Sequence, residues 1–137
     1  MDAPASPRPR RRLVAALLLL AVIGAGLAVH ALLPDTAATD IAGDALYAAA
    51  AYLAVVIVAP HLRPVMSGCL AAAWCVAVEL FQLTGIPLQA GAVFPPAMLV
   101  LGTVFDARDL IVYLVTVAVL VAIDAVLSAR STRRNRA

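Results

Sequence analysis

The residues with the clearest potential for chemistry are a glutamate and a glutamine inside an apolar stretch. Glu79 and Gln82 lie near the end of residues 65–83, which are otherwise largely apolar. Their i, i+3 spacing would place both side chains on one face of a helix. An ionisable group in hydrocarbon is costly unless it is paired or neutralised, so Glu79 needs partners. Such an acid is a candidate functional residue, and a structural role in helix packing is the alternative.

Four aspartates at the starts of two other apolar stretches could face this pair. Asp40 and Asp44 begin one stretch, and Asp106 and Asp109 begin another. A carboxylate at a helix N-terminus is stabilised by about 0.3–1 kcal/mol, so capping alone could explain these aspartates. Asp44 and Asp109 lie one turn deeper, and we expect them to face a partner.

Glu79 is predicted near the C-terminus of its helix, where the helix dipole opposes a negative charge. Two arrangements would satisfy it. Arg108 could form an ion pair with it, or a neutral Glu79 could form hydrogen bonds with Gln82 or Tyr47. The predicted polar pocket comprises Asp44, Tyr47, Glu79, Gln82, Arg108, Asp109 and Tyr113.

No established catalytic or cofactor motif accompanies these residues. The sequence contains no phosphate loop, dinucleotide fingerprint, Ser-His-Asp set or zinc motif. We therefore predict no catalytic residue, no cofactor and no metal ligand. The sequence does not decide whether the protein is an enzyme, but it favours a protein without catalytic activity.

The elements that carry these residues must be membrane-spanning helices. The chain has 137 residues and is 64% hydrophobic, whereas a soluble domain is about 45–50% apolar. The apolar runs are continuous, which indicates helices rather than strands, and about 20 residues cross a bilayer. We predict an all-α, polytopic four-helix bundle over residues 13–127, between basic tails at 1–12 and 128–137, with spans at about 13–33, 41–59, 65–85 and 109–127.

Two segments depart from the pattern of four retained spans. The first span could instead be a cleaved signal peptide, although its apolar run exceeds the usual length of a signal core of about 7–15 residues. Residues 87–102 are apolar but too short for a span, and Pro95 and Pro96 interrupt any helix there. We expect a short external segment at the membrane interface.

The arginines predict the orientation of the bundle. All ten basic residues are arginine, and eight of them lie in the two tails. With both termini in the cytoplasm, every arginine except Arg108 is on the cytoplasmic side, as the positive-inside rule requires. Asp124 would then meet Arg130 and its neighbours. The tails carry no element that stacks on bases or reads a groove, so we expect lipid contact and no nucleic-acid binding.

Several short blocks resemble a known family. Gly43 to Tyr47, Val78 to Gln82 and Leu99 to Gly102, followed by Phe105, Asp109 and Tyr113, are similar to the bacterial membrane proteins grouped as domain of unknown function 2809. The resemblance extends over residues 41–127 and implies a four-helix, multi-pass bundle without an established activity. The Glu-Leu-x-Gln block also resembles VanZ-like proteins, which are linked to the cell envelope.

These features predict an uncharacterised multi-pass protein of the bacterial cytoplasmic membrane. Its external acidic pocket would bind a polar or cationic envelope group, such as a lipid head group or another small molecule, without catalysis. Three alternatives stay open: a small proton- or ion-coupled carrier, a structural or assembly subunit, and a membrane enzyme acting on a lipid-linked substrate. The oligomeric state also stays open, with a homo-oligomer among the alternatives.

Overall fold

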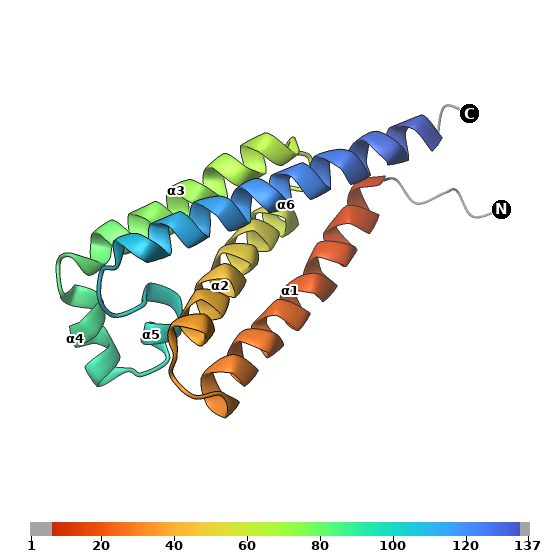
Figure 1. Cartoon of the computed structure of the whole chain (residues 1–137). Helices are drawn as coiled ribbons and strands as arrows, with labels where there is room; N and C mark the ends of the chain where they lie inside the picture. The colour runs from red at the N-terminus through yellow and green to blue at the C-terminus, as the bar shows by residue number, and fades with distance from the viewer. Residues whose placement is uncertain (1–6, 135–137) are drawn as a thin grey trace.

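The computed structural model describes residues 7–134, and within that range it is helical without any strand (Figure 1). The ends of both basic tails, and the side chains of Arg8, Arg133, Arg134 and Arg136, lie outside what is described. The helices are α1 (Pro7–Leu32), α2 (Ala37–Val58), α3 (Pro64–Gln82), α4 (Ile86–Val93), α5 (Ala97–Leu101) and α6 (Ala107–Arg134).

Four of these helices are long enough and apolar enough to cross a bilayer. They are α1, α2, α3 and α6, and their apolar windows correspond to the four predicted spans. The expectation of an all-α bundle with four membrane-spanning helices is therefore confirmed. The apolar segment between α3 and α6 forms two short helices, α4 and α5, because Pro95 and Pro96 follow α4 and interrupt it.

The bundle consists of a three-helix group with one helix at its edge. Helices α2, α3 and α6 pack on one another, whereas α1 makes extensive contact with α2 alone. Small side chains permit the close approach of the three central helices, with Ala48, Ala71 and Cys75 fully buried. Gly68 of α3 lies so close to Val121 of α6 that an added Cβ atom would overlap it.

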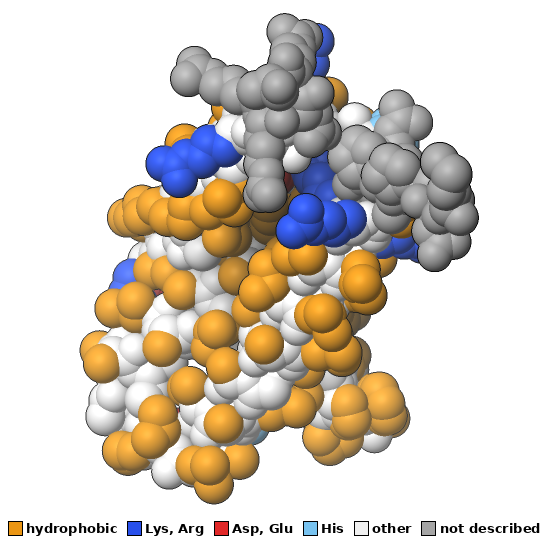
Figure 2. All heavy atoms as spheres, turned by 90° about the vertical axis from the view of Figure 1, so that its right-hand side faces the viewer, with side chains coloured by type: hydrophobic (Ala, Val, Ile, Leu, Met, Phe, Trp, Pro, Cys, Tyr) orange, Lys and Arg blue, Asp and Glu red, His pale blue; other side chains and the backbone are white. Residues whose placement is uncertain are grey.

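The two ends of the bundle differ in charge. At one end, called here the basic end, α1 and α3 begin and α2 and α6 finish (Figure 1). The opposite, acidic end carries the starts of α2 and α6, the end of α3, and the helices α4 and α5. Between the ends, apolar side chains are spread over the side shown in Figure 2. Helix α1 has many exposed leucines, among them Leu17 and Leu20. Such a surface suits contact with lipid chains.

A hydrogen-bonded cluster closes the basic end. Arg11 Nη1 donates to the carbonyl oxygens of Pro60 (2.7 Å) and Leu62 (2.8 Å), and Arg11 Nη2 donates to Asp124 Oδ2 at 2.6 Å. The Tyr52 hydroxyl also donates to Asp124 Oδ2, at 2.7 Å. The basic partner of Asp124 is therefore Arg11 of α1 rather than Arg130, and it joins α1 to the α2–α3 turn and to α6.

Helix caps at the acidic end differ from one aspartate to another. Thr36 caps α2 through a reciprocal pair of hydrogen bonds with Thr39, so the helix begins before Asp40, which is not the cap. Asp106 does occupy the cap position of α6, where its Oδ1 accepts from the backbone N–H of Arg108 at 2.8 Å. Capping therefore accounts for Asp106. Asp40 and Asp109 lie in the first turns of α2 and α6, where the helix dipole favours a carboxylate, and Asp44 lies deeper in α2.

Candidate functional site

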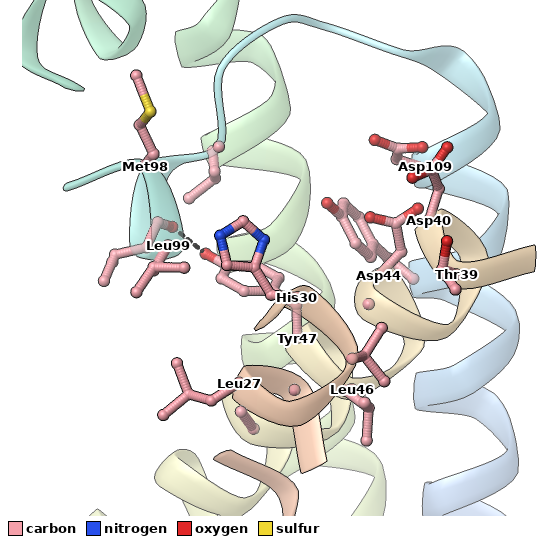
Figure 3. Close-up of a pocket in the computed structure, with 18 of the residues that line it drawn as sticks. Leu27, His30, Thr39, Asp40, Asp44, Leu46, Tyr47, Met98, Leu99 and Asp109 are labelled. Carbon is pink, nitrogen blue, oxygen red and sulfur yellow. Dashed lines mark hydrogen bonds between the residues drawn. The ribbon is translucent and has the colours of Figure 1, made fainter. Parts of the chain in front are cut away.

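A cavity of about 640 Å³ lies at the acidic end. Its walls come mainly from α1 and α2, with smaller contributions from α3, α5 and α6. Figure 3 shows Asp40, Asp44 and Asp109 gathered on one side of this space, and Met98 and Leu99 of α5 on the other. Of the seven residues predicted as a polar pocket, six line the cavity: Asp44, Tyr47, Gln82, Arg108, Asp109 and Tyr113.

Glu79 is the seventh, and it lies behind the cavity wall instead of in it. Its side chain is fully buried. Oε1 accepts from the Tyr113 hydroxyl (3.2 Å) and from Gln82 Nε2 (3.3 Å), and Oε2 accepts from the backbone N–H of Asp106 at 3.3 Å. Glu79 thereby joins α3, the start of α6 and the segment before it. It positions two residues that line the cavity, Gln82 and Tyr113.

Of the partners proposed from the sequence, Gln82 does form a hydrogen bond with Glu79, whereas Tyr47 and Arg108 pair with other groups. Arg108 Nη2 lies 3.5 Å from Asp109 Oδ1 and 3.8 Å from both Asp40 Oδ2 and Asp106 Oδ2. One guanidinium is thus shared among three carboxylates, of which those of Asp40 and Asp109 line the cavity. The Nε–H of Arg108 is buried and has no hydrogen-bond partner.

Gln82 has a fixed orientation in the cavity wall. Its Nε2 donates to Glu79 Oε1 and to the carbonyl oxygen of Leu101, at 3.3 and 3.0 Å. Both partners are acceptors, so the amide nitrogen must face them. The side chain is only 6% exposed, and its Oε1 is buried without a partner. Such an acceptor is costly to bury unless a donor reaches it.

Asp44 presents a second unsatisfied acceptor. Its Oδ2 is buried without a hydrogen-bond partner. The carboxyl groups of Asp44 and Asp109 lie close enough to interact with each other, and Arg108 and Glu79 also affect Asp44 electrostatically. The polar side of the cavity therefore brings together acidic groups from α2 and α6. It also leaves Asp44 Oδ2 free to accept a hydrogen bond.

Helix α5 is held over the cavity by hydrogen bonds to its last residues. The Tyr47 hydroxyl donates to the carbonyl oxygen of Val100 at 2.7 Å and accepts from Trp74 Nε1 at 3.0 Å. Gln82 bonds the next carbonyl oxygen, that of Leu101. The chain then turns at Gly102, which has a φ of 63°. An added Cβ atom there would overlap Gln82 Nε2.

Replacing Gly102 with alanine should therefore disturb the cavity more than the same change at Gly85. Both glycines have a positive φ, but the space around Gly85 is open for a Cβ atom. We expect Gly85→Ala to cost about 1 kcal/mol of stability from backbone strain, and Gly102→Ala to cost at least about twice as much because Gln82 must move. Hydrogen exchange of residues 97–106 in bicelles measures the difference, and equal exchange in the two variants would contradict the assigned role of Gln82.

Several cavity residues were not predicted from the sequence. For Asp40, capping of the helix had been an open alternative, and His30 was not among the predicted pocket residues. The apolar wall from α1, which includes Val22, Gly26 and Leu27, was not expected at all. The clearest signal in the sequence is a pair of glycines. Gly26 and Gly43 lie equally far from the turn between the first two helices, so both would lie at the same depth in the membrane.

The carboxylates at this site do not form a metal-binding set. Within residues 7–134, no three His, Cys, Asp or Glu side chains are arranged to hold a metal ion. Arg108 occupies the space between Asp40, Asp106 and Asp109, at 3.5–3.8 Å from each. The free acceptors of Asp44 and Gln82 lie in the wall of the same cavity and suit a donor from an organic molecule.

Comparison with known proteins gives one match. A family model described as "Protein of unknown function (DUF2809)" matches residues 33–117. The match begins after α1 and includes every residue of the predicted polar pocket. No curated protein and no solved structure matches the chain. Because the family model covers more than half of the sequence, the chain belongs to the DUF2809 family of proteins of unknown function.

Proposed function

We propose that this protein is a binding protein of the bacterial cytoplasmic membrane, and that its cavity holds a cationic group of an envelope molecule without chemical change. The observation that carries the proposal is the composition of the cavity wall. Four carboxylates, of Asp35, Asp40, Asp44 and Asp109, face a space with one guanidinium, that of Arg108. An excess of negative charge beside low-dielectric walls attracts a cation.

The proposed orientation places the cavity on the outer side of the membrane. The start of α1 and the end of α6 lie at the same end of the bundle (Figure 1). Arg63 and the described arginines near the start of α1 and the end of α6 belong to that basic end, so the positive-inside rule supports its position in the cytoplasm. The acidic cavity then faces the periplasmic or external side, where envelope molecules are found.

Asp44→Asn tests the binding proposal. The substitution keeps the shape of the side chain and removes the negative charge of the carboxylate whose Oδ2 is the free acceptor. We expect the affinity for ethanolamine, a small primary ammonium ion, to fall about tenfold, because a charge-assisted hydrogen bond contributes about 1.5–3 kcal/mol. Saturation-transfer NMR in detergent micelles measures the dissociation constant.

Asp106→Asn is the matched control. It removes a carboxylate at the same end of the bundle, but Asp106 does not line the cavity, and asparagine can still cap α6. We expect little change in ethanolamine affinity. If Asp44→Asn binds ethanolamine as tightly as the wild type does, or if Asp106→Asn weakens binding equally, the cavity is not the cation site.

A further inference from the structure

We propose that the occupant is a membrane phospholipid with a primary ammonium head group, and that one of its acyl chains lies between α1 and α5. This inference rests on the proposed function and specifies the ligand of the same cavity. It depends on three features of the cavity: its depth, the separation of its polar and apolar walls, and the types of unpaired atoms in its polar wall.

The depth of the cavity exceeds what a small cation needs. It extends from Asp35 and Thr39, near the α1–α2 turn, to Val22 of α1 and Ala50 of α2. At 1.5 Å per residue, Val22 lies about 15 Å along α1 from its end at Leu32. That length corresponds to about half of a bilayer core of about 30 Å. The cavity therefore reaches the depth at which acyl chains lie.

The walls separate into a polar part and an apolar part. In Figure 3 the three aspartates lie on the opposite side from Leu27, Met98 and Leu99. Helix α1 makes extensive contact with α2 alone, so α1 and α5 face each other across the cavity without packing together. A ligand that reaches the cavity from the bilayer would pass between these two helices, and it would need an apolar portion.

The unpaired buried atoms match the head group of such a lipid. Asp44 Oδ2 and Gln82 Oε1 are acceptors without partners, and Arg108 Nε is a donor without one. A primary ammonium group supplies N–H donors for the two acceptors, and a phosphate oxygen accepts from the guanidinium. An aminoalkyl phosphate carries both groups a few bonds apart. A simple cation would leave Arg108 Nε unpaired.

Two glycines create room for the acyl chain. Gly26 of α1 and Gly43 of α2 lie at equal distances in sequence from the two ends of the α1–α2 turn, and both line the cavity. A Cβ atom added at either position would meet no other atom within 4 Å. Because Gly26 lines the cavity and has open space beside it, we expect a larger side chain there to occupy part of the cavity. Gly24 has equally open surroundings but does not line the cavity, so it provides a control on the same helix.

The test compares Gly26→Leu with Gly24→Leu in nanodiscs that contain equal amounts of phosphatidylethanolamine, phosphatidylcholine and phosphatidylglycerol. Native mass spectrometry after release from the nanodisc identifies the lipid that each variant retains. We expect the wild type and Gly24→Leu to retain phosphatidylethanolamine about tenfold over either other lipid, and Gly26→Leu to lose that preference. Thermal unfolding in detergent shows whether both variants fold equally well.

Binding of free ethanolamine separates failure of this inference from failure of the proposed function. Gly26→Leu should bind ethanolamine as the wild type does, because the leucine would fill the apolar part of the cavity. If ethanolamine binding depends on Asp44 but the three lipids are retained equally, or if Gly26→Leu keeps the preference, the lipid assignment is wrong and the cation site stands. If ethanolamine does not bind, both proposals are wrong. Retention of phosphatidylcholine equal to that of phosphatidylethanolamine would exclude recognition of N–H donors.

Discussion

Glu79→Ala is expected to lower the free energy of unfolding by about 3 kcal/mol, because each buried donor left without an acceptor costs about 1–3 kcal/mol and three donors now meet at this carboxylate. Those donors are the Tyr113 hydroxyl, Gln82 Nε2 and the backbone N–H of Asp106. Glu79→Gln keeps the volume and one oxygen, so its loss should be about half as large. Reversible unfolding of the reconstituted protein by a denaturing detergent measures both values.

Leu80→Ala is the control for this pair of variants. Leu80 is the next residue of α3, and its side chain is largely exposed on the outside of the bundle. Removing it should change the free energy of unfolding by less than about 1 kcal/mol. In a lipid-like environment an exposed leucine is surrounded by apolar groups in the folded and the unfolded state alike. An unfolding free energy for Glu79→Ala that matches the Leu80→Ala value would show that Glu79 does not hold α3, α6 and the α5–α6 segment together.

Arg11→Ala should lower the free energy of unfolding by about 2 kcal/mol, because it removes three hydrogen bonds and leaves Asp124 without its basic partner. The two side chains are 23% and 19% exposed, so solvent reduces the effect below that of a fully buried pair. A double-mutant cycle with Asp124→Asn isolates the pair, and we expect a coupling energy of about 1 kcal/mol. The same unfolding assay applies.

Arg12→Ala is the matched control for Arg11→Ala. Arg12 is the neighbouring arginine of α1, and it is exposed at the basic end. It should contribute through attraction to anionic lipid and little to unfolding. Equal destabilisation by Arg11→Ala and Arg12→Ala, together with a coupling energy near zero, would mean that the Arg11–Asp124 bridge does not hold α1 on the bundle.

The four long helices could be predicted because hydrophobicity over about 20 residues requires them. Their partners could not be predicted so easily. Asp124 was expected to meet Arg130, close in sequence, but it pairs with Arg11, which is 113 residues away. Sequence spacing gives neighbours along one helix, whereas the choice between equivalent arginines depends on how the helices pack.

The polar pocket shows the same division between local and long-range information. Residue types and helical spacing identified Asp44, Gln82 and Asp109 as polar groups at one depth. The backbone N–H of Asp106 has no signature in the sequence, so its hydrogen bond to Glu79 could not be foreseen. The apolar wall from α1 was equally hidden, because lipid-facing and cavity-facing leucines look the same in a membrane helix.

The measurement that tests the central claim most directly is a distance by solid-state NMR between the head-group nitrogen of ¹⁵N-labelled phosphatidylethanolamine and the carboxyl carbon of Asp44. The protein would be reconstituted in bilayers of that lipid, with Asp106 as the reference carboxylate outside the cavity. A bound ammonium group should place the nitrogen within about 4 Å of the Asp44 carbon, as a charge-assisted N–H···O bond requires. A dipolar coupling to Asp44 no stronger than the coupling to Asp106 would contradict a cation site in this cavity.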